Sequence, residues 1–271
     1  MPSVISLLTD FGPSGVAVSE MKATIFGITP EARLVDICHT IKPQNIPEAA
    51  RILSRSPFYF PDGTVHIYVV DPGVGTARRP LITRIGAQTF VGPDNGTLTL
   101  ALRRAQEEGW PTAFYHINQP QYWRPKISNI FHGRDIFAPV AAHLANGVPV
   151  EAVGSPITDP VLLPLPRVEK TSTGVRGQVA VAVAHFGNLI TNIHAKDLES
   201  WEGVTVRIYG GEGRMTDIHG LVRTFGDKPV GELVALIGSD DELVIAEVNG
   251  HAANRIGAGV GDVVEVILNG Q

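Results

Sequence analysis

Short apolar runs alternate with stretches of helical periodicity along the first half of the chain. Runs rich in Val, Ile and Leu that end at polar or turn residues are typical of strands. The expected strands are Val4–Leu8, Leu34–Cys38, Val65–Val70, Leu81–Ile85 and Ala113–Ile117. The expected helices are Val16–Ile28, Ile46–Ser56 and Arg134–Asn146, the last of which ends at an Asn-Gly stop. This alternation predicts an α/β domain with a largely parallel sheet over residues 1–154.

The pattern changes at residues 155–174, where prolines exclude a helix or a central strand. We expect a linker there. Shorter β-type runs separated by Gly-rich turns follow, at Gln178–Ala184, Val204–Tyr209, Leu233–Ile237, Leu243–Val248 and Val263–Leu268. They predict a small β-barrel or sandwich as a second domain over residues 175–271, and the barrel is the preferred form.

Composition narrows the class of partner. The 271 residues are 44% hydrophobic, which is enough for two cores. With 22 Lys and Arg against 27 Asp and Glu, the formal charge of −5 gives no general reason to bind nucleic acid or an anionic membrane. The first apolar run is too short for a signal sequence or a membrane span, so we expect a cytoplasmic protein with a small-molecule partner. The single cysteine, Cys38, excludes an internal disulfide and a cysteine-based zinc cage.

Two expected strands end in a carboxylate. Asp10 closes the first strand within Thr9–Gly12, and Asp71 begins a Gly-rich loop that runs to Arg78 and Arg79. Carboxyl ends of parallel strands share one edge of a sheet, where such folds hold ligands. The loop is long enough to return an arginine to Asp71, and adjacent arginines point apart, so one of the pair faces inward. The alternative is that both aspartates only stabilise turns.

Other polar clusters flank the helix 134–146 and a later strand. His132 stands immediately before that helix and is either catalytic or an ordinary loop histidine. Phe186 and Asn188 join an aromatic face to an amide, which suits a purine, although a β-bulge at Gly187 would explain the same residues. The segment Gly92–Gly96 has the composition of a turn.

Taken together in order, these motifs resemble one family from Ile5 to Val266: the S-adenosylmethionine (SAM) hydrolases, or hydroxide adenosyltransferases, which are relatives of the fluorinase and the chlorinase. The motifs that carry the resemblance are Thr9–Gly12, Asp71–Thr76 with Arg78, Gly92–Gly96, Phe131–Asp135 and Phe186–Asn192.

The resemblance implies an α/β domain, a β-barrel and a homotrimer with each active site between neighbouring subunits. It also implies in-line attack of water on ribose C5′ of SAM, which releases adenosine and methionine without a cofactor or a metal. The implied catalytic residues are Asp71, Arg78 and His132. Among the implied substrate-binding residues, Asp10 would hold the ribose hydroxyls, Phe186 and Asn188 the nucleoside, and Ser239 the methionine end. Phe11, Asn95 and Glu247 complete the set of substrate-binding residues.

The choice of nucleophile depends on local differences within this family. The halogenating members carry an aromatic residue in place of Asp71 and a serine near Gly133, whereas this chain has the hydrolase form at both places. A carboxylate repels halide and accepts a hydrogen bond from water. The alternatives are a SAM-dependent halogenase, a non-catalytic SAM or adenosine sensor, and a metal-dependent hydrolase. The last would use Asp10, Asp71, His132 and Asp135, whose spacing matches no metal motif.

Overall fold

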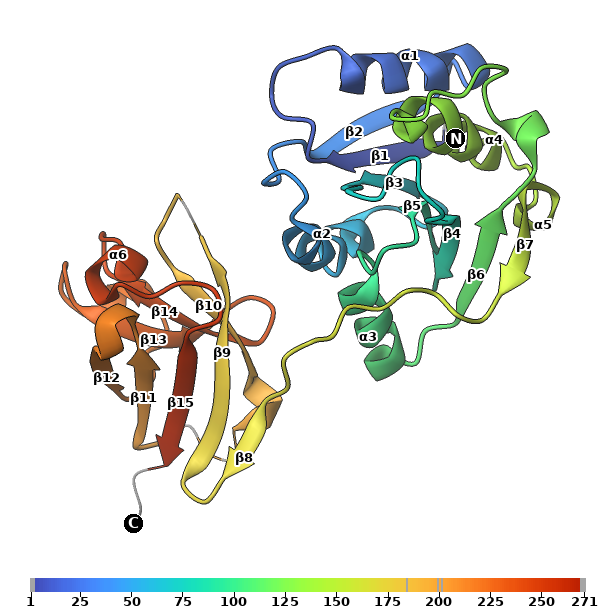
Figure 1. The fold of residues 1–271 in the computed structure, drawn as a ribbon. Helices are drawn as coiled ribbons and strands as arrows, with labels where there is room; N and C mark the ends of the chain where they lie inside the picture. Colours follow the sequence, from blue (N-terminus) through green and yellow to red (C-terminus); the bar gives the residue numbers. More distant parts are fainter. Residues whose placement is uncertain (1–2, 184, 199, 201, 269–271) are drawn as a thin grey trace. The chain divides into compact units, whose positions relative to one another are not determined.

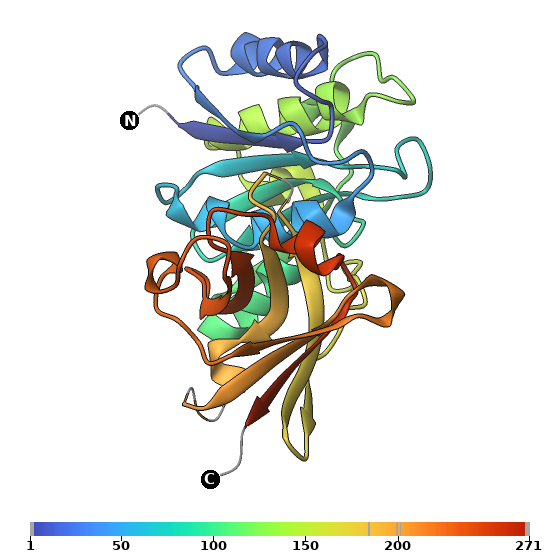
Figure 2. The ribbon, with the colours of Figure 1, turned by 90° about the vertical axis from the view of Figure 1, so that its left-hand side faces the viewer.

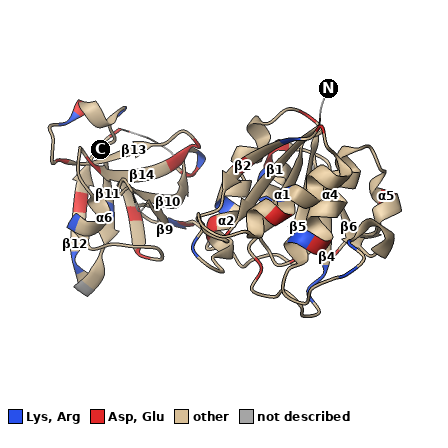
Figure 3. Ribbon diagram, turned by 90° about the horizontal axis from the view of Figure 1, so that it is seen from above, with Lys and Arg blue, Asp and Glu red and all other residues tan. Residues whose placement is uncertain are grey.

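A computed structural model describes residues 3–183, 185–198, 200 and 202–268 of the chain. These residues divide into two units. The first unit ends at Leu163 and the second begins at Pro164 (Figure 1). Blue and red segments are interspersed in both units rather than gathered in one block of a single sign (Figure 3). No helix in the described part of the chain is both long and apolar enough to cross a membrane.

The first unit is built on a seven-stranded sheet with the order β2-β1-β3-β5-β4-β6-β7. The pairs β2–β1, β1–β3 and β3–β5 are parallel, and the pairs β5–β4, β4–β6 and β6–β7 are antiparallel. The strand bounds are β1 Val4–Thr9, β2 Arg33–Cys38, β3 Val65–Val69, β4 Pro80–Ile85, β5 Gln88–Pro93, β6 Thr112–Ile117 and β7 Gly154–Ile157. The parallel block confirms the α/β class.

Helices cover both faces of this sheet (Figures 1 and 2). Residues of α1 (Ala17–Ile28) and α4 (Ala138–Ala145) share one core with Ile5 and Leu7. Residues of α2 (Ile46–Leu53) and α3 (Thr99–Glu108) share the other core with Leu8. Because successive strand residues point to opposite faces, one apolar strand supplies both cores. A short helix, α5 (Val150–Val153), precedes β7.

Several expected elements differ from the structure for local reasons. Strand β5 and helix α3 were not expected, since β5 ends in Gly92 and Pro93 and α3 carries few apolar residues. Helix α2 ends at Leu53 rather than Ser56, and a separate 3-10 turn, Ser56–Tyr59, follows with Pro57 near its start. The helix expected over 134–146 begins as a π-helical turn, Gly133–Phe137, ahead of α4. Such turns are common at functional sites.

The second unit is an antiparallel, nearly closed barrel, as expected. Its sheet has the order β12-β11-β15-β9-β10-β14-β13, with β8 paired to β9. The bounds are β8 Glu169–Thr171, β9 Gly174–Ala182, β10 Leu189–His194, β11 Val204–Tyr209, β12 Met215–His219, β13 Leu233–Ile237, β14 Glu242–Glu247 and β15 Val263–Leu268. Alternate residues of these strands fill the interior, among them Val179, Leu189, Val206, Ile245 and Val266. Helix α6 (Ala252–Ile256) adds to this core through Ala252 and Ile256.

The segment expected to be a linker, 155–174, contains most of β7 and all of β8. Strand β7 lies at the edge of its sheet and β8 pairs only with β9, so a proline such as Pro156 interrupts no central ladder. Ala184, the last residue of one expected strand, lies outside the described residues.

Candidate active site

The loop after β3 folds back so that its last part meets its first residue. Arg78 donates from Nε to Asp71 Oδ1 at 3.1 Å and from Nη2 to Asp71 Oδ2 at 2.5 Å. The side chains of Arg78 and Asp71 are only 6% and 4% exposed. A two-point contact with a buried carboxylate fixes the plane of the guanidinium as well as its position. The pair is therefore a rigid, charge-balanced unit at the carboxyl end of a parallel strand.

His132 joins this pair through Arg78. The Nη2 atom of Arg78 lies 3.1 Å from His132 Nδ1. Because a guanidinium only donates, Nδ1 must accept, and the proton of the neutral imidazole lies on Nε2. Burial, and then the charge of Arg78, lower the pKa of His132, while Asp71 and Asp135 oppose that shift. His132 is thus a neutral imidazole at pH 7, and its Nε2–H has no hydrogen-bond partner among the described residues.

Arg78 has one further polar atom in the site. The face of the Phe137 ring lies 5.4 Å from Arg78 Cζ, and Phe137 is fully buried in the π-helical turn. Arg78 Nη1 is buried and has no hydrogen-bond partner among the described residues. An unsatisfied buried donor costs roughly 1–3 kcal/mol, so such atoms are rare and mark places where a ligand or water is bound.

Arg79 points away from Asp71. It contacts the buried carboxylate of Asp94 at 2.8 Å and Asp159 at 2.9 Å. The side chains of adjacent residues in an extended segment point in opposite directions. Arg79 accordingly reaches Asp94 and Asp159, whereas Arg78 reaches Asp71. The structure therefore brings Arg78, and not its neighbour, to the carboxylate of Asp71.

Glycines allow the loop of Asp71 to approach the segment that carries His132. Gly75 has φ +76°, and a Cβ there would overlap the carbonyl oxygen of Asn129. Gly133 lies against Met21, Phe131 and Val69, where a Cβ would lie 3.2 Å from the sulfur of Met21. A larger residue at position 75 would push the two segments apart, whereas one at position 133 would press on the side chain of Met21.

Asp135 stabilises the segment that carries His132 and is fully buried. Its carboxylate accepts hydrogen bonds from Arg134 at 2.7 Å and from the backbone N–H of Ser128 at 2.8 Å, and its carbonyl accepts one from the Arg124 N–H. Burial by itself would raise the pKa of Asp135, but the two hydrogen bonds to its carboxylate and the nearby arginines lower the pKa overall. Asp135 is thus a structural residue. Among the described residues, no three His, Cys, Asp or Glu side chains come together as metal ligands would.

Asp10 and Phe11 lie on the loop after β1, beside the segment of His132. Asp10 is half-buried and its Oδ2 accepts the backbone N–H of Gln44 at 2.7 Å. Phe11 contacts Phe131 edge to face, with ring centroids 5.9 Å apart. The carboxylate of Asp10 has lone pairs beyond the one that Gln44 uses, so it can accept ligand hydroxyls as well.

Asn95 bonds to its own chain. Its Nδ2 donates to the carbonyl of Val70 at 2.9 Å, and its Oδ1 accepts from the Thr97 N–H at 3.2 Å and the Thr97 hydroxyl at 2.5 Å. Neither this contact nor those of Asp94 and Phe137 could be read from the sequence, because each joins segments distant along the chain.

The other expected ligand residues belong to the second unit. Phe186 is 64% exposed, at the turn between β9 and β10. Glu247, at the end of β14, accepts the His251 N–H at 2.9 Å and the Arg255 Nη1 at 2.9 Å. The ring of His251 packs so closely on Gly187 that a Cβ there would overlap it. Phe186, Asn188 and Glu247 therefore gather at one end of this unit.

Ser239 is exposed in the turn that precedes β14, at the opposite end of that strand from Glu247. At roughly 3.3 Å per residue, the six residues of β14 span about 20 Å. A ligand that reached both groups would lie extended along this strand.

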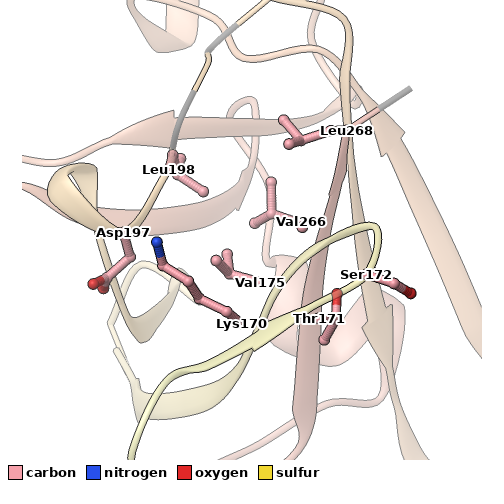
Figure 4. A pocket seen from close by; sticks show the side chains of 9 residues that line it. Lys170, Thr171, Ser172, Val175, Asp197, Leu198, Val266 and Leu268 are labelled. Atoms are coloured by element: carbon pink, nitrogen blue, oxygen red, sulfur yellow. The ribbon is translucent and has the colours of Figure 1, made fainter. Parts of the chain in front are cut away.

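Two hollows lie away from these residues. A cavity of about 120 Å³ in the second unit is lined by Lys170, Asp197, Leu198 and Val266, with the Lys170 and Asp197 side chains on the same side (Figure 4). An open groove of about 730 Å³ in the first unit lies between α1, α4 and Trp123–Pro125. Neither is lined by Asp71, Arg78 or His132.

Comparison with known proteins covers nearly the whole chain. Residues 5–154 match the model of the SAM hydroxide adenosyltransferase N-terminal domain, and residues 178–265 match that of its C-terminal domain. The chain is 36% identical to the (R)-S-adenosyl-L-methionine hydrolase of Thermus thermophilus, over 97% of this chain and 99% of that protein. It is 29% identical to the fluorinase of Nocardia brasiliensis, over 90% and 89% of the two chains.

Among solved structures, an uncharacterized conserved protein from Thermotoga maritima superposes with a TM-score of 0.87. It is 35% identical, and the match covers 97% of this chain and 99% of that one.

Proposed function

The chain belongs to the SAM hydroxide adenosyltransferase family, and we propose that it hydrolyses S-adenosyl-L-methionine to adenosine and L-methionine. The observation that carries the proposal is the contact of Asp71, Arg78 and His132 at the carboxyl end of β3. A carboxylate that is held rigidly beside a neutral imidazole donor is suited to water, which must both lose a proton and be oriented. The binding residues of the second unit would supply a surface for the adenosine and the methionine.

The leaving group of this reaction needs no help from an acid. The sulfur of SAM is a sulfonium, so it leaves C5′ as a neutral thioether and takes the bonding electron pair with it. The enzyme must therefore mainly place a nucleophile in line behind C5′, and positioning alone is worth several kcal/mol. Water is a weak nucleophile, which is why a proton acceptor beside it matters.

Asp71 is the acceptor that the geometry favours. Nδ1 of His132 already accepts from Arg78 and Nε2 carries the imidazole proton, so neither nitrogen is free to take a proton from water. Each oxygen of Asp71 keeps a lone pair beyond its bond to Arg78. In this scheme one lone pair of the water oxygen bonds to C5′ while one water proton passes to Asp71, and the sulfur leaves with the C5′–S bonding pair. The remaining lone pair can accept one hydrogen bond, from His132 Nε2–H or from Arg78, which orients the water.

The substrate would be held by the second set of residues. By the family resemblance, Phe186 and Asn188 would bind the nucleoside, Asp10 the ribose hydroxyls and Ser239 the methionine end. Phe11 and Glu247 would also contact the substrate. From the family resemblance we also propose a homotrimer with active sites between neighbouring subunits, acting in the cytoplasm without a metal or an organic cofactor.

Isotope labelling tests this function directly. The purified chain is incubated with SAM in ¹⁸O-labelled water, with and without chloride. We expect adenosine that carries ¹⁸O at C5′, with no requirement for chloride. Formation of 5′-chloro-5′-deoxyadenosine, or binding of SAM without turnover, would overturn the proposal. Size-exclusion chromatography with light scattering tests the trimer separately.

A further inference from the structure

The loop that carries Asp71 and Arg78 crosses over the end of a strand. It leaves β3 at Val70 and enters β4 at Pro80, yet β5 lies between these two strands in the sheet. The end of β5, with Asp94 and Asn95, therefore lies between the two ends of this loop, as the strand labels in Figure 1 show. The residues after β5 are placed to contact both ends.

Asn95 contacts the first end of the loop. Its Nδ2 donates to the carbonyl of Val70, the residue before Asp71, at 2.9 Å. Thr97 fixes the orientation of this amide, because its N–H and its hydroxyl donate to Asn95 Oδ1. A reversed amide would place N–H groups against both donors and an oxygen against a carbonyl.

Asp94 contacts the second end. Its backbone N–H donates to the carbonyl of Arg79 at 2.9 Å, and its carboxylate accepts from Arg79 Nε at 2.9 Å. The other carboxylate oxygen accepts the Val161 N–H at 2.8 Å, and the side chain is only 1% exposed. Arg79 is adjacent to Arg78, so Asp94 fixes the backbone from which the guanidinium of Arg78 returns to Asp71.

We infer that Asp94 and Asn95 form a clip that holds both ends of the loop Asp71–Arg79 and thereby sets the geometry of the Asp71–Arg78 pair. Both act as positioning residues through their contacts with the two ends of the loop. The inference rests on the proposed function only for its kinetic consequence, since the clip itself is a property of the folded chain. Displacing a reacting group by about 1 Å costs on the order of 10²-fold in rate, so the clip matters for turnover.

The test uses Asn95→Asp and Asp94→Asn in the full chain, with Thr97→Val as a milder variant that only removes a donor to Asn95. Asn146→Asp is the matched control, because Asn146 Nδ2 also donates to a backbone carbonyl, that of Ile28, at 3.0 Å. That contact lies at the ends of α1 and α4 and not at the loop. Kinetics with SAM and hydrogen exchange of the peptides that contain residues 70–79 are measured for each protein.

We expect Asn95→Asp and Asp94→Asn to lower kcat by roughly 10- to 100-fold with KM within about twofold of the unmodified chain. Exchange of the loop amides should rise by about tenfold or more, with smaller changes in Thr97→Val and none in Asn146→Asp. A rise in KM at unchanged kcat, or loop exchange equal to that of the unmodified chain, would overturn the clip. If the unmodified chain does not hydrolyse SAM, the proposed function is wrong, and the exchange experiment still decides for or against the clip.

Discussion

Removing Arg78 should destabilise the first unit far more than removing a similar surface arginine. Arg78→Met leaves the carboxylate of Asp71, 4% exposed, without its counter-charge and without two hydrogen bonds. Breaking a buried ion pair on one side costs about 3–5 kcal/mol. The double variant Asp71→Leu with Arg78→Met buries no charge, so it should recover about 2 kcal/mol or more.

The assay is urea unfolding at pH 7.5, monitored by intrinsic fluorescence, for both single variants and the double variant. Arg207 supplies the control, since it pairs with Asp217 through two bonds of 2.8 Å while both side chains are 28% exposed. Arg207→Met should cost much less free energy of unfolding than Arg78→Met because solvent screens exposed pairs. Strictly additive losses in the double variant would refute the coupling of Asp71 and Arg78. Turnover of SAM should fall at least about 10²-fold in all variants of this pair.

Three further outcomes follow from single residues. Because the pKa of His132 is lowered below its usual 6.5, kcat/KM should stay level as pH falls through 6.5 and decline only in more acidic solution; a decline centred above 6.5 would contradict the neutral imidazole. Burial lowers the pKa of His66 from 6.5 to about 4. The contribution of the neutral His66 to the free energy of unfolding is therefore fully present above pH 6.5, and roughly 3 kcal/mol of it is lost as pH falls towards 4. Urea unfolding at pH 7 and pH 4.5 measures this loss, which His66→Gln should reduce; an equal loss in that variant would exclude His66 as its source. Because Phe186 is 64% exposed, Phe186→Ala should change the free energy of unfolding by less than about 0.5 kcal/mol. The same variant should raise KM for SAM about tenfold, because the ring no longer stacks on the nucleoside. An unchanged KM would show that Phe186 does not contact the substrate.

Much of the fold was predictable where local pattern and tertiary environment agree. The expected runs Val204–Tyr209, Leu233–Ile237 and Val263–Leu268 have the bounds of β11, β13 and β15, because β-branched residues there fill a barrel interior. Strand β5 was missed because its burial comes from neighbours on both sides in the sheet and not from its own composition. Sheet order is a non-local property, and periodicity carries no information about it.

The candidate site shows the same division between local and non-local information. Asp71 and His132 were recognisable from their places at a strand end and before a helix. The choice of Arg78 over Arg79 came from the resemblance, and the structure supplies its physical reason in the ion pairs of Arg79 with Asp94 and Asp159. The tautomer of His132 depends on a contact between residues 54 positions apart, so sequence alone offers no route to it.

The combination of donors and one acceptor explains why this site is suited to water rather than halide. Arg78 and His132 both offer N–H groups, and such groups stabilise either a halide or an oxygen that is acquiring negative charge. Asp71 separates the two cases, because its lone pairs can take a proton from water but only repel a halide, which has none to give. The ion pair with Arg78 does not remove this discrimination, since it neutralises net charge while leaving each carboxylate oxygen able to accept another hydrogen bond. Under the proposed function, selectivity for water would therefore reside in Asp71, and the N–H donors of Arg78 and His132 would affect the rate at which water reacts.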